Sequence, residues 1–247
     1  MCPRPGETAA GTALSYRIAS QSSSSGLGMK DMADAHIPPP PANRILSVGK
    51  ERHVSISSGS SCTVESHNEI SVFDESLVEF LGGAIEQVAK TGDAQSSKYI
   101  LEKDVFIGVQ KIPDISIRAY LKRMLKYIDG PELGSESWEQ LSLGARSLIF
   151  ALIYIDRIAQ KTNLVINSYR IHRLIAAGML VALKMNEDDA LNMSYFSLLA
   201  GIPVNQLNQL EKTFLSKIGF DTFVSEVEFK SRVTVFKLLA ARRSRLD

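Results

Sequence analysis

The 247-residue sequence has few of the features that mark membrane, secreted or nucleic-acid-binding proteins. Its longest uncharged apolar run has ten residues, 174–183, whereas a bilayer-spanning helix needs about 20. Cys2 and Cys62 are too few for a disulfide framework and have no metal-binding spacing. A formal net charge of +1 gives no reason to expect nucleic acid or an anionic membrane as a partner. The first residues also lack a secretory signal, so we expect an intracellular protein, cytoplasmic or nuclear.

Motifs of catalysis are missing as well. The sequence contains no glycine-rich phosphate loop, no GxSxG motif and no cluster of cysteine and histidine at metal-ligand spacing. Glu187, Asp188 and Asp189 are adjacent, so they lack the spaced oxygen ligands of a calcium loop. We therefore expect no enzymatic activity, no metal, no cofactor and no small-molecule substrate.

The segment 1–72 differs in composition from the rest of the chain. It contains fourteen Ser, six Pro and six Gly, and Tyr16 is its only aromatic residue. Such a segment cannot bury enough apolar surface to offset the ~1–2 kcal/mol per residue lost when a backbone is ordered. We predict a disordered tail over 1–72 and a folded domain over 73–247.

Helical periodicity begins at Phe73. Apolar residues recur every three or four positions, and no segment alternates convincingly as a strand would. The fourth helical segment is apolar on every side between Leu174 and Leu183, so other helices must surround it. The sequence predicts an all-α fold with helices over about 73–90, 116–128, 137–161, 168–185, 193–200, 204–218 and 225–245. Asp74 or Ser76 is expected to cap the first, and Asn167 or Ser168 the fourth.

Several ordered motifs resemble one family. YIDR ends one helix, HRLIAAGMLVALK forms the central one, and NMSYFSLLAG and LNQLEKTFL follow. Together they resemble the cyclin box, and most closely the phosphate-regulatory cyclins, also called P-type or U-type. The resemblance covers roughly 115–229 and implies a single box, a five-helix bundle around its third helix, with a core of about 115–222 and flanking helices. It also implies a regulatory subunit that binds and activates a cyclin-dependent kinase in cell-cycle or nutrient and phosphate signalling.

The resemblance assigns roles to particular residues. It implies that Lys184 and Glu211 hydrogen-bond to the kinase beside its regulatory helix. It also implies that Asp156 of YIDR pairs with a basic residue of the first box helix, for which we expect Arg123, with Arg118 as second choice. From position alone, Lys184 can instead extend to solvent at a helix end, and Glu211 can be a solvated surface residue.

Asp188 and Asp189 follow Lys184 closely, so we expect them to lie near the kinase as well. A phosphorylated activation segment works by gathering arginines, and a carboxylate from the cyclin can engage an arginine in the same bidentate way. The alternative is a solvated turn whose charges end the helix.

Two other functions are compatible with a cyclin fold. Lys237, Arg242, Arg243 and Arg245 make the last helix basic, which is compatible with a nucleic-acid-binding module, although only over a few turns. A cyclin-fold adaptor without a kinase partner is the other alternative.

The first box helix, SIRAYLKRM, lacks the substrate-docking motif of many cell-cycle cyclins, so we do not expect that kind of docking.

Overall fold

The computed structural model describes residues 72–96, 104–107, 112–130, 137–188 and 191–243. The predicted tail, 1–72, lies outside these ranges except for Val72. Within them the all-α prediction is confirmed, and no helix there combines the length and apolarity needed to cross a membrane. The helices of the described ranges are α2 (Val72–Ser96), α3 (Ile117–Asp129), α4 (Leu143–Thr162), α5 (Ile171–Asn186), α6 (Met193–Ala200), α7 (Val204–Ile218) and α8 (Glu226–Arg243).

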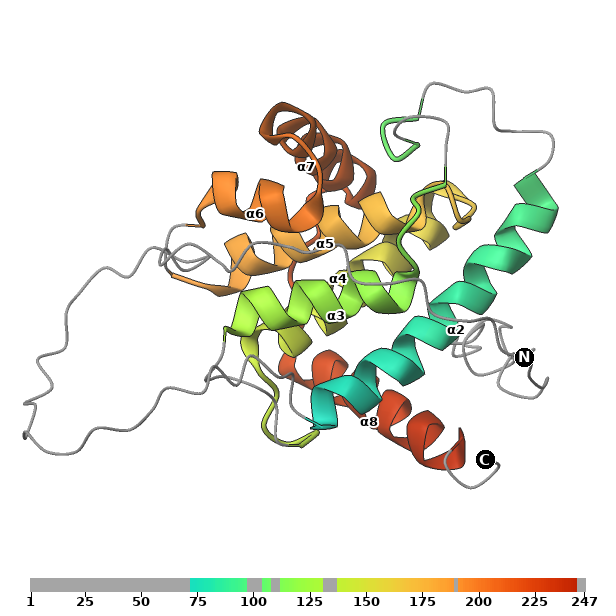
Figure 1. Ribbon diagram of the computed structural model, residues 1–247, viewed down its shortest axis with the longest axis vertical. Helices are drawn as coiled ribbons and strands as arrows, with labels where there is room; N and C mark the ends of the chain where they lie inside the picture. Colours follow the sequence, from blue (N-terminus) through green and yellow to red (C-terminus); the bar gives the residue numbers. More distant parts are fainter. Residues whose placement is uncertain (1–71, 97–103, 108–111, 131–136, 189–190, 244–247) are drawn as a thin grey trace, which may run out of the picture.

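Helix α5 occupies the centre of the bundle. All ten residues from Leu174 to Leu183 are buried, as its apolar sequence predicts. Helices α4 and α7 pack directly against it, and α6 and α7 lie at the opposite end of the view from α8 (Figure 1). Gly178 permits the close approach of α4, because a Cβ atom there would lie 2.9 Å from the Cβ of Ala151.

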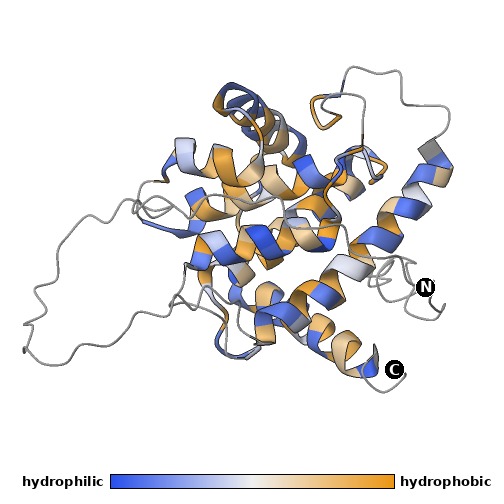
Figure 2. Cartoon of the chain, viewed as in Figure 1, coloured by the Kyte–Doolittle hydropathy of each residue, from blue (hydrophilic) through white to orange (hydrophobic). Residues whose placement is uncertain are grey.

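Helix α2 covers α3 on the outside of the bundle. Polar and apolar residues alternate along α2 (Figure 2), and the side chains of Leu77, Leu81 and Ile85 are buried in the core. Its acidic side chains meet the basic residues of α3 at the rim, where Lys122 Nζ lies 2.9 Å from Glu75. Ion pairs at such exposed positions contribute ~0–1 kcal/mol, so the buried apolar face holds α2 in place.

Polar side chains determine where several helices begin. Ser142 caps α4 by accepting from the Ala145 N–H, so α4 begins six residues later than the predicted position 137. The predicted cap of α2 is also wrong, because the helix already begins at Val72 and contains Asp74 and Ser76.

The start of the central helix also differs from its predicted cap. Asn167 accepts from the Arg170 N–H and closes the turn before α5. The helix itself begins at Ile171 without a side-chain cap. Ser168, the other predicted cap, instead donates through its backbone and its hydroxyl to Asp93 of α2.

Asp129 joins the end of α3 to the beginning of α4. Its Oδ1 accepts from the Gly144 N–H at 2.6 Å, and its Oδ2 accepts from the Ser142 hydroxyl at 2.8 Å. Burial raises the pKa of Asp129 to about 7; the hydrogen bonds from Gly144 and Ser142 oppose the rise, and the charge of Asp74 adds to it. The carboxyl group is therefore sensitive to pH near neutrality.

Candidate functional site

Lys184 and Glu211, both predicted from the sequence to bind a partner, lie together on the surface. Lys184 is in the last turn of α5, and Glu211 is in the middle of α7. The Lys184 Nζ donates to both carboxylate oxygens of Glu211 at 2.9 Å, with 33% of the lysine side chain and 19% of the glutamate side chain exposed. The sequence did not predict that they would bind each other. Each keeps hydrogen-bonding capacity for a partner, because an ammonium has three donors and a carboxylate has about four acceptor sites.

Exposed apolar side chains lie at the end of α5 and just after the end of α7. Met185, next to Lys184, is 55% exposed. Phe220 and Phe223, which follow the end of α7, are 72% and 79% exposed. Scattered exposed apolar residues are normal, but aromatic side chains presented together mark interaction sites. Sequence reasoning missed these three. For Phe220 and Phe223, the available signal was their position within four residues after Gly219, which ends α7.

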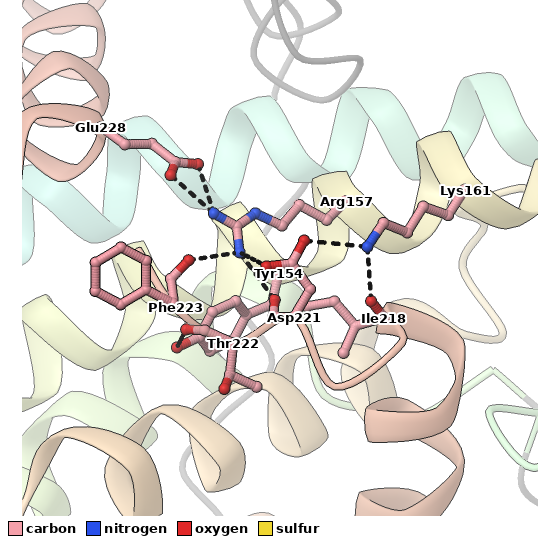
Figure 3. A network of polar contacts seen from close by, with 8 residues as sticks. All are labelled: Tyr154, Arg157, Lys161, Ile218, Asp221, Thr222, Phe223 and Glu228. Atoms are coloured by element: carbon pink, nitrogen blue, oxygen red, sulfur yellow. Dashed lines mark hydrogen bonds and ion pairs between the residues drawn. The ribbon is translucent and has the colours of Figure 1, made fainter. Parts of the chain in front are cut away.

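The connection between α7 and α8 is fixed by side chains of α4 (Figure 3). The Arg157 guanidinium donates to the carbonyls of Asp221 at 2.8 Å and Phe223 at 2.9 Å, and to the Glu228 carboxylate at 2.8 and 3.0 Å. The Tyr154 hydroxyl donates to the Thr222 carbonyl at 2.9 Å. Anchored at these points, the backbone presents Phe223 from a defined position.

This connection lies next to the end of α5. The side chain of Asn186, the last residue of α5, interacts with the Tyr154 hydroxyl. This interaction opposes the rise in the pKa of Tyr154 that burial causes. Tyr154 in turn holds Thr222. The segments that carry Met185 and Phe223 are therefore neighbours. We refer to Lys184, Glu211, Met185, Phe220 and Phe223 as the pair surface.

Asp188 is exposed beyond the end of α5 and forms no ion pair with a residue in the described ranges. Asp189 lies outside those ranges. Within them, no three side chains of the metal-binding types come together. The predicted role of Asp188 and Asp189 at a partner is thus compatible with an accessible carboxylate at position 188, and it stays a prediction.

The predicted pairing of Asp156 with Arg123 is wrong. Asp156 is fully buried on α4, and its Oδ2 lies 2.9 Å from the Nη1 of Arg232 on α8. Arg123 instead lies on the flank of α3 beside α6, with its guanidinium 5.2 Å from the ring centroid of Tyr120. Arg118, the second choice, reaches Glu79 and Glu86 of α2 at 3.4 and 3.5 Å. Because α8 packs along α4, a basic residue 76 positions away supplies the partner that a buried carboxylate requires.

Comparisons with known proteins agree with this architecture. A family model described as Cyclin matches residues 41–222, which is more than half of the chain. Cyclin-U4-3 of Arabidopsis thaliana is 33% identical over 157 residues, covering 63% of this chain and 64% of that protein. Cyclin-P4-1 of Oryza sativa subsp. japonica is 28% identical over 167 residues, which are 65% of this chain and 72% of that one.

A fungal protein is similar to a comparable extent. The "PHO85 cyclin-like protein psl1" of Schizosaccharomyces pombe is 29% identical over 175 residues, covering 65% of this chain and 67% of the relative. Three findings lead to the same family: the helical bundle around one buried helix, the family match across most of that bundle, and the relatives of the U and P types. The chain belongs to the cyclin family and is a cyclin of the P/U type.

Proposed function

We propose that this cyclin binds a cyclin-dependent protein serine/threonine kinase and activates it, without catalysing a reaction itself. The observation that carries the proposal is the pair surface, where Lys184 and Glu211 present a charged hydrogen-bonding pair and the ends of α5 and α7 carry exposed apolar side chains. The name of the Schizosaccharomyces pombe relative, which describes it as PHO85 cyclin-like, supports a kinase partner of this class.

The chemistry of the pair surface suits a helix or strand whose backbone groups are accessible at its end. The Lys184 ammonium can donate to backbone carbonyls of a partner, and the Glu211 carboxylate can accept from backbone N–H groups. Phe220 and Phe223 supply apolar area of the kind that dominates the binding energy of interfaces. A partner that covers the Lys184–Glu211 pair excludes water from it, which strengthens its hydrogen bonds.

Activation then follows from the position of one kinase helix. In protein kinases an ion pair between a strand lysine and a glutamate of the regulatory helix must form before phosphate transfer. A cyclin that binds only the inward position of that helix shifts the kinase population toward the active state. Asp188 and Asp189 would then engage an arginine of the activation segment, in place of a phosphate.

The test is a reconstituted binding and phosphotransfer assay. The chain is used to capture kinases from the source cell, and the captured kinase is then expressed, purified and assayed with and without the cyclin. We expect phosphotransfer only in the complex.

The double variant Lys184→Ala/Glu211→Ala should weaken binding at least ~30-fold, because truncating charged partners at an interface costs ~2–5 kcal/mol. Lys212→Ala, an exposed charge on the same helix, is the control and should bind normally. Capture of no kinase, or normal activation by the double variant, would contradict the proposal.

A further inference from the structure

The basic residues of α3 are neutralised on one flank only. Arg118 and Lys122 face α2, where Glu75, Glu79 and Glu86 supply counter-charges. Arg123 lies on the other flank and forms no ion pair or hydrogen bond with any described residue. Its Nε is fully buried without an acceptor. A charged donor withdrawn from water without a partner is costly, so hydrogen bonding to the described residues does not account for the position of Arg123.

Stacking on an aromatic ring holds Arg123 in this position. Its guanidinium lies 5.2 Å from the centroid of the Tyr120 ring, a cation–π distance. The Tyr120 hydroxyl donates to the Ala200 carbonyl at 3.3 Å, which fixes the ring against the end of α6. The Nη2 of Arg123 lies beside Gly201, 3.6 Å from where a Cβ atom would be. The guanidinium is therefore preorganised at the junction of α3 and the α6–α7 turn.

A second arginine without a counter-charge lies near the same ring. The Nε of Arg173 donates to the Val105 carbonyl, and both terminal nitrogens donate to Gln206 Oε1, all at 3.0 Å. These acceptors are neutral, and two of the five N–H donors of a guanidinium remain. The acidic residue next to Val105, Asp104, is already paired with Arg170 at 2.8 Å.

Both arginines meet the segment that joins α6 to α7, Arg123 at Gly201 and Arg173 at Gln206. Burial raises the pKa of Tyr120, and the positive charges of Arg123 and Arg173 both oppose that rise. Arg123 also helps burial to lower the pKa of the nearby His172. Helix α7 begins at this place without a side-chain cap from Pro203. The Gln206 N–H of its first turn donates to the Asn205 side chain, whereas the N–H groups of Val204 and Asn205 remain available.

We propose that Arg123 and Arg173, together with the beginning of α7, form a binding site for an oxyanion, a carboxylate or phosphoryl group carried by a protein partner. A planar or tetrahedral oxyanion accepts paired N–H donors from guanidinium groups and is favoured at a helix N-terminus. The site differs from the pair surface, since Arg173 and Lys184 are eleven residues apart on α5, about 16 Å at 1.5 Å per residue. It therefore allows a second contact while the pair surface is occupied.

NMR titration of the full chain tests the site, with inorganic phosphate and acetate as separate probes and chloride at equal ionic strength as reference. The Arg123 Nε–H resonance and the backbone amides of Gly201 and Asn205 report on binding directly. We expect saturable shifts of these resonances with phosphate, acetate or both; phosphate alone would identify a phosphoryl ligand, and acetate alone a carboxylate. Shifts that match those in chloride would overturn the proposal.

Variants separate this site from general charge attraction. Arg123→Gln and Arg173→Gln should each reduce the saturable shifts at Gly201 and Asn205 at least several-fold. Lys122→Gln removes an equal charge from the compensated flank of α3 and should leave them unchanged. Equal losses in all three variants, or none in the first two, would show that no specific site exists. Because each arginine is changed separately, a folding defect in one variant, detected by its thermal melt, leaves the other as the test.

Discussion

Arg232 of α8 and Asp156 of α4 form a buried ion pair, with 2.9 Å between Nη1 and Oδ2. The carboxylate is fully buried, so its charge depends on this guanidinium and on the hydrogen bonds around it. The pair makes α8 part of the packed body rather than an appended helix, and the stacking of Phe229 on Phe150 at 4.7 Å adds to the same contact.

Replacing Arg232 should therefore destabilise the fold. We expect Arg232→Leu to lower the free energy of unfolding by about 3–5 kcal/mol, because it leaves a buried carboxylate unpaired. Urea denaturation followed by circular dichroism measures the effect. The matched control is Lys230→Ala, which removes an exposed charge from the same helix and should change stability by less than ~0.5 kcal/mol. Equal stability of the two variants would show that the pair does not hold α8.

The pH dependence of stability should reveal Asp129. Its folded-state pKa of about 7 is above the usual 3.8, so the folded protein binds its proton more tightly than the unfolded chain does. The resulting stabilisation is complete below about pH 4 and is lost as the pH rises through about 7. Asp129→Asn keeps the hydrogen-bonding shape of the protonated acid and removes the titration. Over this pH range the wild type should lose stability relative to the variant; parallel curves would contradict a raised pKa.

The contact between α4 and α5 should tolerate no added methyl group. Gly178→Ala would place a Cβ 2.9 Å from that of Ala151, and overpacking of this kind costs ~1–3 kcal/mol. Thermal melts should show this loss and a partial recovery in the double variant Ala151→Gly/Gly178→Ala, which removes the opposing methyl group. A stable single variant would mean that the two helices move apart readily.

The acidic residues after α5 lead to a prediction about kinase regulation. If a carboxylate of Asp188 or Asp189 replaces the activation-segment phosphate, the unphosphorylated complex should transfer phosphate at a substantial rate. Asp188→Asn/Asp189→Asn should then lower that rate more than tenfold while the affinity between the subunits changes little. Phosphotransfer by the complex, with mass spectrometry to confirm an unphosphorylated segment, provides the measurement. Full activity of the double variant would reject the role.

The sequence predicted those parts of the fold that depend on local pattern. The all-round apolar run of α5 identified the central helix, and Gly201 correctly ended α6. The beginning of α4 was missed because Ser137 and Ser142 are both capable caps. Ser142 is selected by its additional bond to Asp129, a contact between helices that periodicity does not contain.

The candidate site was predictable to a similar degree. Lys184 and Glu211 were found as individual residues, but their direct hydrogen bonds depend on how α7 crosses α5. The partner of Asp156 was missed because Arg232 is 76 positions away and α8 lies outside the segment taken as the core of the box. The exposure of Phe223 likewise depends on the hydrogen bond from Arg157 to the Phe223 carbonyl, which fixes the connection between α7 and α8. A local sequence pattern cannot predict this contact, because Arg157 is on α4.

A charge swap at the pair surface tests the central claim most directly. Lys184→Glu/Glu211→Lys restores an ion pair between α5 and α7 but reverses the charges that a partner meets. We expect a melting temperature close to that of the wild type and kinase binding weakened at least ~30-fold in a calorimetric titration. Wild-type affinity of the swapped protein would contradict the account, because it would mean that the pair serves only to join α5 to α7.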